Sequence, residues 1–132
     1  MSFSKLDYEK TSAKGVLIAA VETGRAKSVS VIKFLPGSSF PSHSHGKATE
    51  RYFAVSGKGI VSVGKLKRVL DKGDSIEIGR GRVHSVSNPF KRQFVMVEIS
   101  IPGFDEKDVL FGPKGRKIQA ERIKYRKSRP FH

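Results

Sequence analysis

The chain contains no cysteine among its 132 residues. This absence excludes disulfides, zinc–thiolate sites, iron–sulfur clusters and cysteine nucleophiles. It is compatible with a reducing compartment, although many secreted proteins also lack cysteine. A length of 132 residues favours one domain with a core of its own.

Long hydrophobic segments are also missing. The longest apolar run is GVLIAAV at 15–21, far below the roughly 20 residues that a membrane span needs. The first residues, MSFSKLDYEKTSAKG, contain no apolar stretch of the kind found in signal peptides. We therefore expect a soluble, cytoplasmic protein that does not enter a membrane.

Acidic residues are few, with 12 Asp and Glu against 26 Lys and Arg, which gives a net charge of +14. Such an excess favours anionic partners. Residues 114–132 hold eight Lys or Arg and one Glu, half of the net charge. We interpret 113–132 as a basic extension of a domain at 1–112. It is either a solvated tail or, in a minority interpretation, a nucleic-acid contact with few aromatic residues for base stacking.

Short strand-like runs fill the chain up to residue 101, and breaks rich in glycine separate them. Their spacing predicts an all-β sandwich or barrel, and no run before residue 104 has the periodicity of a long helix. After Pro102 the composition is loop-like. The predicted strands are 15–21, 27–34, 51–56, 59–63, 74–78, 82–87 and 93–101.

Two of the four histidines, His43 and His45, stand two residues apart in GSSFPSHSHGKATERYFAVSG. On a strand both side chains leave the same face. Glu50 can return a carboxylate after a short turn, and His84 joins them if its strand packs against the first. Three imidazoles and one carboxylate suit Fe, Mn, Ni, Zn or Cu, whereas calcium prefers oxygen ligands.

The spacing forms two motifs, G-x5-H-x-H-x4-E-x6-G over 37–57 and G-x5-G-x-G-x2-H-x3-N over 73–88. They resemble the two sequence motifs of the cupin superfamily, with Gly79 where the family usually has proline. The resemblance implies a double-stranded β-helix, that is, a jelly-roll barrel. It also implies a homodimer and His43, His45, Glu50 and His84 as metal ligands inside the barrel.

A weaker similarity extends downstream, through ERYFAVSGKGIVSV, HSVSNPFKRQFVMVEIS and GFDEKDVLFGPKGR. These segments resemble the cupin domain of type II mannose-6-phosphate isomerases. Tyr52 replaces a tryptophan of that family, the acidic segment is shortened, and the spacing between the paired histidines and the glutamate differs. The similarity implies a sugar phosphate as a small anionic substrate.

Four further residues have competing interpretations. Tyr52 shares the inward face with Glu50 under period-two alternation, so it belongs to the core or forms a hydrogen bond with a substrate near the metal. Arg80 and Arg82 are either solvated or grip an anion at the barrel mouth. Asn88 is expected to cap the loop before Pro89 rather than to touch a ligand.

Three classes of function fit these motifs. The first is a metal-dependent enzyme, an isomerase of sugar-phosphate type or alternatively an Fe-dependent dioxygenase. The second is a non-catalytic module that binds a small ligand, and the third is a nucleic-acid-associated protein that uses residues 114–132. The sequence names no general base for an isomerase, because a carboxylate that ligates metal is poorly suited to that role.

Overall fold

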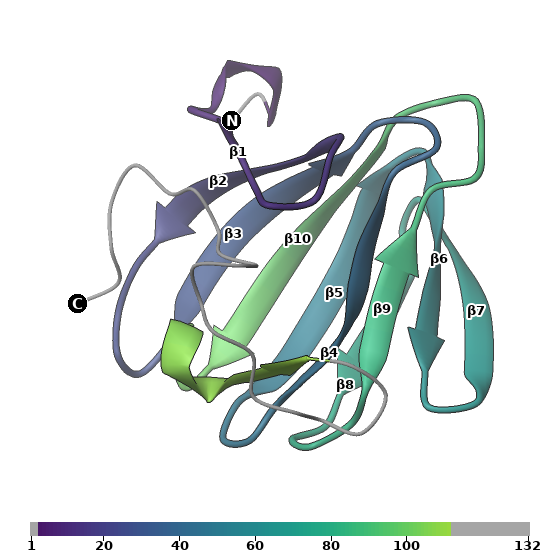
Figure 1. The fold of residues 1–132 in the computed structure, drawn as a ribbon. Coiled ribbons are helices and arrows are strands. Elements are labelled where there is room, and N and C mark those ends of the chain that lie inside the picture. Colours follow the sequence, from purple (N-terminus) through teal and green to yellow (C-terminus); the bar gives the residue numbers. More distant parts are fainter. Residues whose placement is uncertain (1–2, 112–132) are drawn as a thin grey trace.

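The computed structural model describes residues 3–111 of the chain. This part contains eleven strands and two 3-10 helices, joined by turns and loops (Figure 1). This part contains no helix with the length and hydropathy needed to cross a bilayer. The predicted extension at 113–132 lies outside it. In chain order the elements are η1 (Phe3–Lys5), β1 (Glu9–Lys10), β2 (Val16–Glu22), β3 (Ser28–Phe34), β4 (Ser39–His45), β5 (Thr49–Ser56), β6 (Lys58–Val63), β7 (Leu66–Asp71), β8 (Ser75–Ile78), β9 (His84–Ser87), β10 (Phe94–Ile101), η2 (Glu106–Asp108) and β11 (Val109–Phe111).

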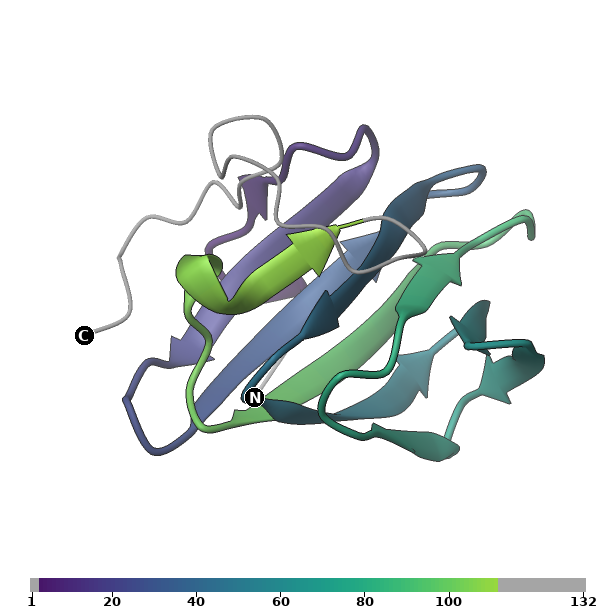
Figure 2. The same cartoon turned by 60° about the horizontal axis from the view of Figure 1, so that its bottom comes forward.

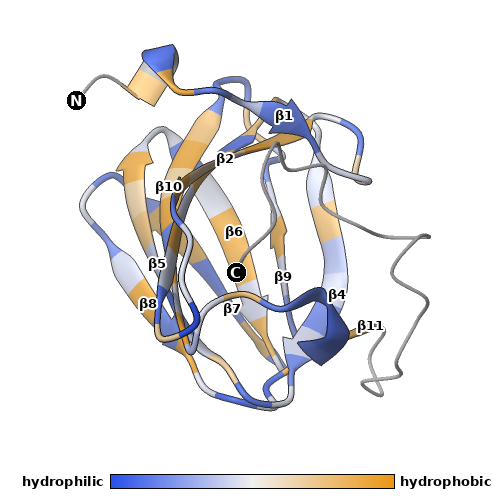
Figure 3. Ribbon diagram, turned by 90° about the vertical axis from the view of Figure 1, so that its left-hand side faces the viewer, coloured by the Kyte–Doolittle hydropathy of each residue, from blue (hydrophilic) through white to orange (hydrophobic). Residues whose placement is uncertain are grey.

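The strands form two antiparallel sheets that face each other (Figures 1 and 3). One sheet has the order β1-β2-β3-β10-β5-β8, and the other has the order β11-β4-β9-β6-β7. Consecutive strands β4 and β5 belong to different sheets, as do β5 and β6, so the chain winds between the layers. This is the predicted double-stranded β-helix.

The inward faces of both sheets carry the core. Strand β5 shows the expected alternation, since Glu50, Tyr52 and Ala54 are buried and the residues between them are partly exposed. Phe94 on β10 is fully buried, and its ring lies 5.8 Å from that of Phe34 on β3. The apolar side chains between the sheets therefore hold the two layers together.

The loop between β9 and β10 is fixed by Asn88, which is completely buried. Its amide nitrogen donates to the carbonyl oxygens of Phe34 and Arg92, both at 2.8 Å, and its oxygen accepts from the backbone N–H of Phe90 at 3.0 Å. The expectation that Asn88 caps this loop is confirmed.

Strands β1, β4, β7 and β11 lie outside the predicted strand ranges, and β7 and β11 show why the sequence does not mark them. Strand β7 is at an edge of its sheet, and only Leu70 of its six residues is buried, so no alternation of polar and apolar residues marks it. Strand β11 lies in the segment predicted as a loop, which was wrong for residues 109–111. Its three residues are too few to show a period, and its pairing with β4 comes from distant sequence (Figure 2).

Candidate metal centre

The four predicted ligands come together from both sheets. His43 and His45 lie on β4, and His84 starts the neighbouring strand β9, directly opposite His43 in the register. Glu50 lies near the start of β5 in the other sheet, after the turn at 46–48. Winding between the sheets therefore brings Glu50 opposite the three histidines.

The cluster is tight and closed to solvent. Each of the four residues is at most 3% exposed. One potential ligand atom from each residue lies within 4.8 Å of the others. Glu50 Oε1 lies 3.3 Å from His45 Nε2 and 3.2 Å from His84 Nε2.

Backbone carbonyls orient two of the imidazoles. His43 Nδ1 lies 2.8 Å from the carbonyl oxygen of Pro41, and His84 Nδ1 lies 2.8 Å from that of Arg82. Because a carbonyl only accepts hydrogen bonds, each Nδ1 carries the proton and donates it. The Nε2 lone pair of each ring is then directed into the cluster, as metal-binding histidines require.

Tyr52 orients the carboxylate. Its hydroxyl donates to Glu50 Oε1 at 3.0 Å, and both side chains are buried. Tyr52 also lines the cavity beside the cluster. The structure thus gives Tyr52 a contact with a ligand residue, and its predicted contact with a substrate stays a prediction.

Burial and the charges of neighbouring residues shift the pKa values of His43, His45 and Glu50 in different directions. Burial, with the nearby His84 and His45, lowers the pKa of His43 to about 3. Burial also acts to lower the pKa of His45, but the negative charge of the nearby Glu50 outweighs it and raises that pKa. The same interaction holds the pKa of the Glu50 carboxyl well below its ordinary value despite burial. Glu50 is therefore an anion.

The donor set fits a divalent transition metal. In the described part of the chain, five buried side-chain nitrogen or oxygen atoms lack a hydrogen-bond partner. Four of them belong to this cluster: His43 Nε2, His45 Nε2, His84 Nε2 and Glu50 Oε2. Unsatisfied buried polar atoms are costly, and a metal would satisfy all four at once. Metal–ligand bonds of about 2.1 Å place ligand atoms roughly 3–4 Å apart, close to the observed spread.

A strap formed by η2 and β11 supports the ligand strand from outside. The Asp108 carboxylate accepts hydrogen bonds from the backbone N–H groups of Lys47, at 2.9 and 3.0 Å, and Ala48, at 3.2 Å. The Phe111 ring lies 5.9 Å from the His43 ring, and the Phe104 ring, just before the strap, lies 6.4 Å from the His45 ring. The strap therefore fixes the turn that joins His45 to Glu50.

The turn between β8 and β9 contacts the cluster from the other side. Gly81 has φ of 79°, a conformation that favours glycine, and its N–H donates to the carbonyl oxygen of His45 at 2.7 Å. The neighbouring Arg80 and Arg82 are exposed. Their exposure agrees with both interpretations, so contact with a bound anion stays a prediction.

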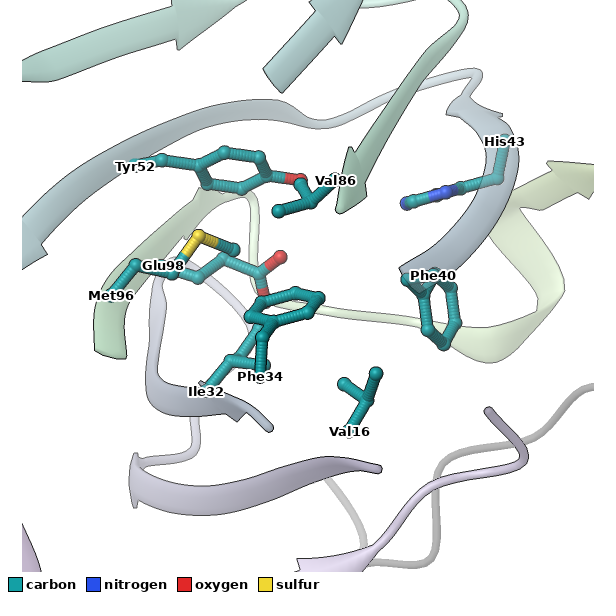
Figure 4. Close-up of a pocket in the computed structure, with 9 residues that line it drawn as sticks. All are labelled: Val16, Ile32, Phe34, Phe40, His43, Tyr52, Val86, Met96 and Glu98. Carbon is teal, nitrogen blue, oxygen red and sulfur yellow. The ribbon is translucent and has the colours of Figure 1, made fainter. Parts of the chain in front are cut away.

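A narrow cavity adjoins the cluster (Figure 4). Its free volume is about 10 Å³, enough for about one water molecule, and His43 forms part of its wall. Glu98 also lines it, although the sequence analysis did not select this residue. The available signal was the position of Glu98, the one acidic residue in the run QFVMVEISI, on the same face as Met96. The lining residues are Val16, Ile32, Phe34, Phe40, His43, Tyr52, Val86, Met96 and Glu98.

Metal binding should depend on pH through His45. Because the pKa of His45 is raised, its imidazole stays mostly protonated at pH 6.5, the ordinary pKa of histidine. A metal must displace that proton in order to bind. We expect the affinity for Zn²⁺ to rise up to about tenfold per pH unit and to keep rising above that value. Competition with a chromophoric chelator from about pH 5.5 to about pH 8 measures the slope. An affinity independent of pH would contradict this protonation scheme.

Removing the strap contact should weaken both the fold and the site. We expect Asp108→Ala to lower the free energy of unfolding by about 1–2 kcal/mol, because the N–H groups of Lys47 and Ala48 lose a charged acceptor. The affinity for Zn²⁺ should fall with it. Glu106→Ala, at an exposed position of the same 3-10 helix, is the control and should change stability by less than about 0.5 kcal/mol. Urea unfolding and chelator competition measure both effects, and equal behaviour of the two variants would refute this role of Asp108.

The fold is shared with solved structures of low sequence identity. KdgF from Halomonas sp. superposes with a TM-score of 0.72 at 18% identity, over 80% of this chain and 94% of that one. A predicted oxalate decarboxylase from Thermotoga maritima gives 0.69 at 22% identity, over 76% and 96%. A recombinant oxalate oxidase in complex with glycolate gives 0.62 at 24% identity, over 74% and 55%. At these identities the likeness shows the fold.

The sequence itself matches a known family. The cupin domain family matches residues 30–100, more than half of the chain, and this region contains all four residues of the cluster. No curated protein matches the chain. The similarity to type II mannose-6-phosphate isomerases remains a resemblance of motifs. With its two-sheet fold, its histidine–glutamate cluster and this match, the chain belongs to the cupin family.

Proposed function

We propose that the chain is a metal-dependent enzyme that acts on a small oxygen-bearing molecule. The proposal rests on one observation, that His43 belongs both to the cluster and to the wall of the cavity. A structural metal site is filled by protein ligands, whereas a catalytic site keeps a position open for water or substrate. A cavity that begins at a ligand histidine offers such a position.

The residues around the cluster hold its side chains in place and give the cavity apolar walls. A bound divalent metal would polarise a carbonyl or hydroxyl oxygen as a Lewis acid. The backbone of Pro41 and the hydroxyl of Tyr52 hold His43 and Glu50 in place. Phe34 and Phe40 make part of the cavity wall apolar, and closure of such a site to water would strengthen electrostatic interactions within it.

The reaction we propose is the isomerisation of a hydroxy-carbonyl compound, of the aldose–ketose type. The motif resemblance to type II mannose-6-phosphate isomerases supports this reaction. Such an isomerisation moves a proton between neighbouring carbons and needs an acid–base group. Glu50 is unsuited to that task, because its carboxylate already accepts from Tyr52 and lies against two histidines.

The substrate we propose has a small, uncharged reacting end. The free volume of the cavity, about 10 Å³, is enough for about one water molecule and far below the roughly 300–1,000 Å³ typical of ligand pockets, so only the reacting atoms of a substrate would enter it. Its lining includes no Lys or Arg. An anionic substituent such as a phosphate would therefore be bound outside the cavity, and we propose the exposed Arg80 and Arg82 as its contacts.

Oxygen chemistry is the second candidate function. Three histidines and one carboxylate also suit Fe or Mn, and four ligands leave positions free on a six-coordinate metal. The fold likeness to an oxalate oxidase and to a predicted oxalate decarboxylase supports a small carboxylic acid as the substrate in this case. The homodimer, the cytoplasmic location and a nucleic-acid contact through residues 114–132 remain predictions.

Proton NMR in D₂O with Zn²⁺- or Mn²⁺-loaded protein tests the proposal. The probes are dihydroxyacetone and dihydroxyacetone phosphate, which differ only in the anionic group. We expect deuterium to enter at the carbon beside the carbonyl and the aldose to form, and both signals to disappear in His84→Ala. Faster reaction of the phosphate ester would support an anion contact at Arg80 and Arg82.

Two other results would favour the alternatives. Oxygen uptake by Fe²⁺-loaded protein with oxalate or glycolate, without proton exchange in either triose probe, would replace the isomerase with an oxygen-dependent enzyme. Bound metal with neither exchange nor oxygen uptake would favour a non-catalytic module that binds a small ligand.

A further inference from the structure

The metal cluster is closed on all sides in this structure. Each of its four residues is at most 3% exposed, and the adjoining cavity has room for about one water molecule. A hydrated metal ion and a sugar-sized substrate are both larger than that space. Part of the wall therefore has to move whenever an ion enters or leaves the cluster.

The strap of η2 and β11 forms the wall beside two of the predicted ligands. After β10 the chain crosses from one sheet to the other, and β11 then pairs with β4 (Figures 2 and 3). In the register Phe111 is opposite His43 and Val109 is opposite His45. These two apolar residues, and Phe104 just before the strap, are at most 6% exposed. They separate the two imidazoles from solvent.

In the described part of the chain, few contacts hold the strap. Strand β11 is a three-residue strand at the edge of its sheet, whereas β4 and β9, which carry the histidines, are paired on both sides. The Asp108 carboxylate accepts from the N–H groups of Lys47 and Ala48, and the N–H of Phe104 donates to Ser28 Oγ at 2.9 Å. Local opening starts at segments with few contacts, so the strap opens more readily than the strands that hold the ligands.

We propose that the strap is a gate to the metal centre, held shut by Asp108. When the strap is shut, Val109 and Phe111 cover His45 and His43. When it opens, β11 separates from β4 while the two sheets stay folded, and both imidazoles become accessible. A metal ion passes in the open form. A substrate passes in the same form, and this part of the inference rests on the proposed function.

A disulfide between β4 and β11 tests the gate, because the chain has no other cysteine. Ser44 and Leu110 are opposite each other in the register. Such pairs have Cα atoms roughly 4.5–5.5 Å apart, within the roughly 4.4–6.8 Å that a disulfide spans. Ser44→Cys, Leu110→Cys therefore locks the strap when oxidised and frees it when reduced. The matched control is Ser62→Cys, Lys67→Cys, an opposite pair on β6 and β7.

The first readout is the release of Zn²⁺ to excess EDTA. We expect the oxidised strap variant to release Zn²⁺ at least about tenfold more slowly than its reduced form, and the two forms of the control to differ by less than about twofold. Oxidation after Zn²⁺ loading should also slow deuterium exchange into dihydroxyacetone, and reduction should restore it. Equal release of Zn²⁺ from both forms of the strap variant would overturn the gate.

Amide hydrogen exchange gives a second readout that needs no metal. In the original chain, the N–H groups of Lys47, Ala48 and Phe104 should exchange much faster than those in the central strands β3 and β10, because the strap opens without unfolding the sheets. The disulfide should slow exchange at Lys47 and Ala48 in the strap variant. Exchange at these three positions as slow as in β3 and β10 would show that the strap opens only with the whole fold, and the gate would be wrong.

The remaining outcomes separate the gate from the proposed function. Slower release of Zn²⁺ from the oxidised strap variant, with unchanged deuterium exchange into dihydroxyacetone, would overturn the passage of substrate through the strap. Failure of the original chain to exchange deuterium, with Zn²⁺ release still controlled by the disulfide, would overturn the isomerase and support the gate for the metal.

Discussion

Four buried ligand atoms without hydrogen-bond partners set the central constraint on this structure. Three imidazole nitrogens and one carboxylate oxygen converge between the sheets, where unsatisfied polar atoms are costly. The Glu50 carboxyl is ionised, and burial lowers the pKa of His43 to about 3, so this ring takes up a second proton only in acid. A divalent cation would balance the carboxylate charge and satisfy all four atoms, so the cluster is consistent with a transition-metal site.

The two-sheet architecture is what makes this arrangement possible. Adjacent strands β4 and β9 place three histidines on one sheet, and the crossing from β4 to β5 brings Glu50 from the other. Contacts outside the cluster then fix each part. The strap residue Asp108 holds the crossing turn, Gly81 supports the backbone of His45, and Tyr52 holds the carboxylate. The cavity adjoins this frame at His43, which belongs to both the cluster and the cavity wall.

Much of this could be predicted from local sequence. The spacing of His43 and His45 places both on one face of a strand, and the two motifs locate Glu50 and His84 within the cupin fold. Strands such as β3, β5 and β10 have enough β-branched and aromatic residues to be recognised. Local patterns succeed here because burial imposes a period of two on residues between the sheets.

Other features depend on contacts between distant residues. Strand β7 is an exposed edge and β11 has only three residues, so neither shows a period. Glu98 was visible as an acid in an apolar strand, but its place in the cavity wall depends on how β10 faces β4 and β9 across the barrel. The support from Asp108 joins residues 60 positions apart. Such relations follow from the packed fold and have no signature in a short window of sequence.

Metal content tests the central claim most directly. Untagged protein, purified without chelator, is analysed by inductively coupled plasma mass spectrometry beside the double variant His45→Ala, His84→Ala. The variant His132→Ala, which changes the histidine outside the cluster and its motifs, is the matched control. We predict about one Fe, Mn, Ni or Zn per chain in the original protein and in His132→Ala, with loss of that metal in the double variant. No metal in the original protein, even after reconstitution, would contradict the account of a metal-centred fold.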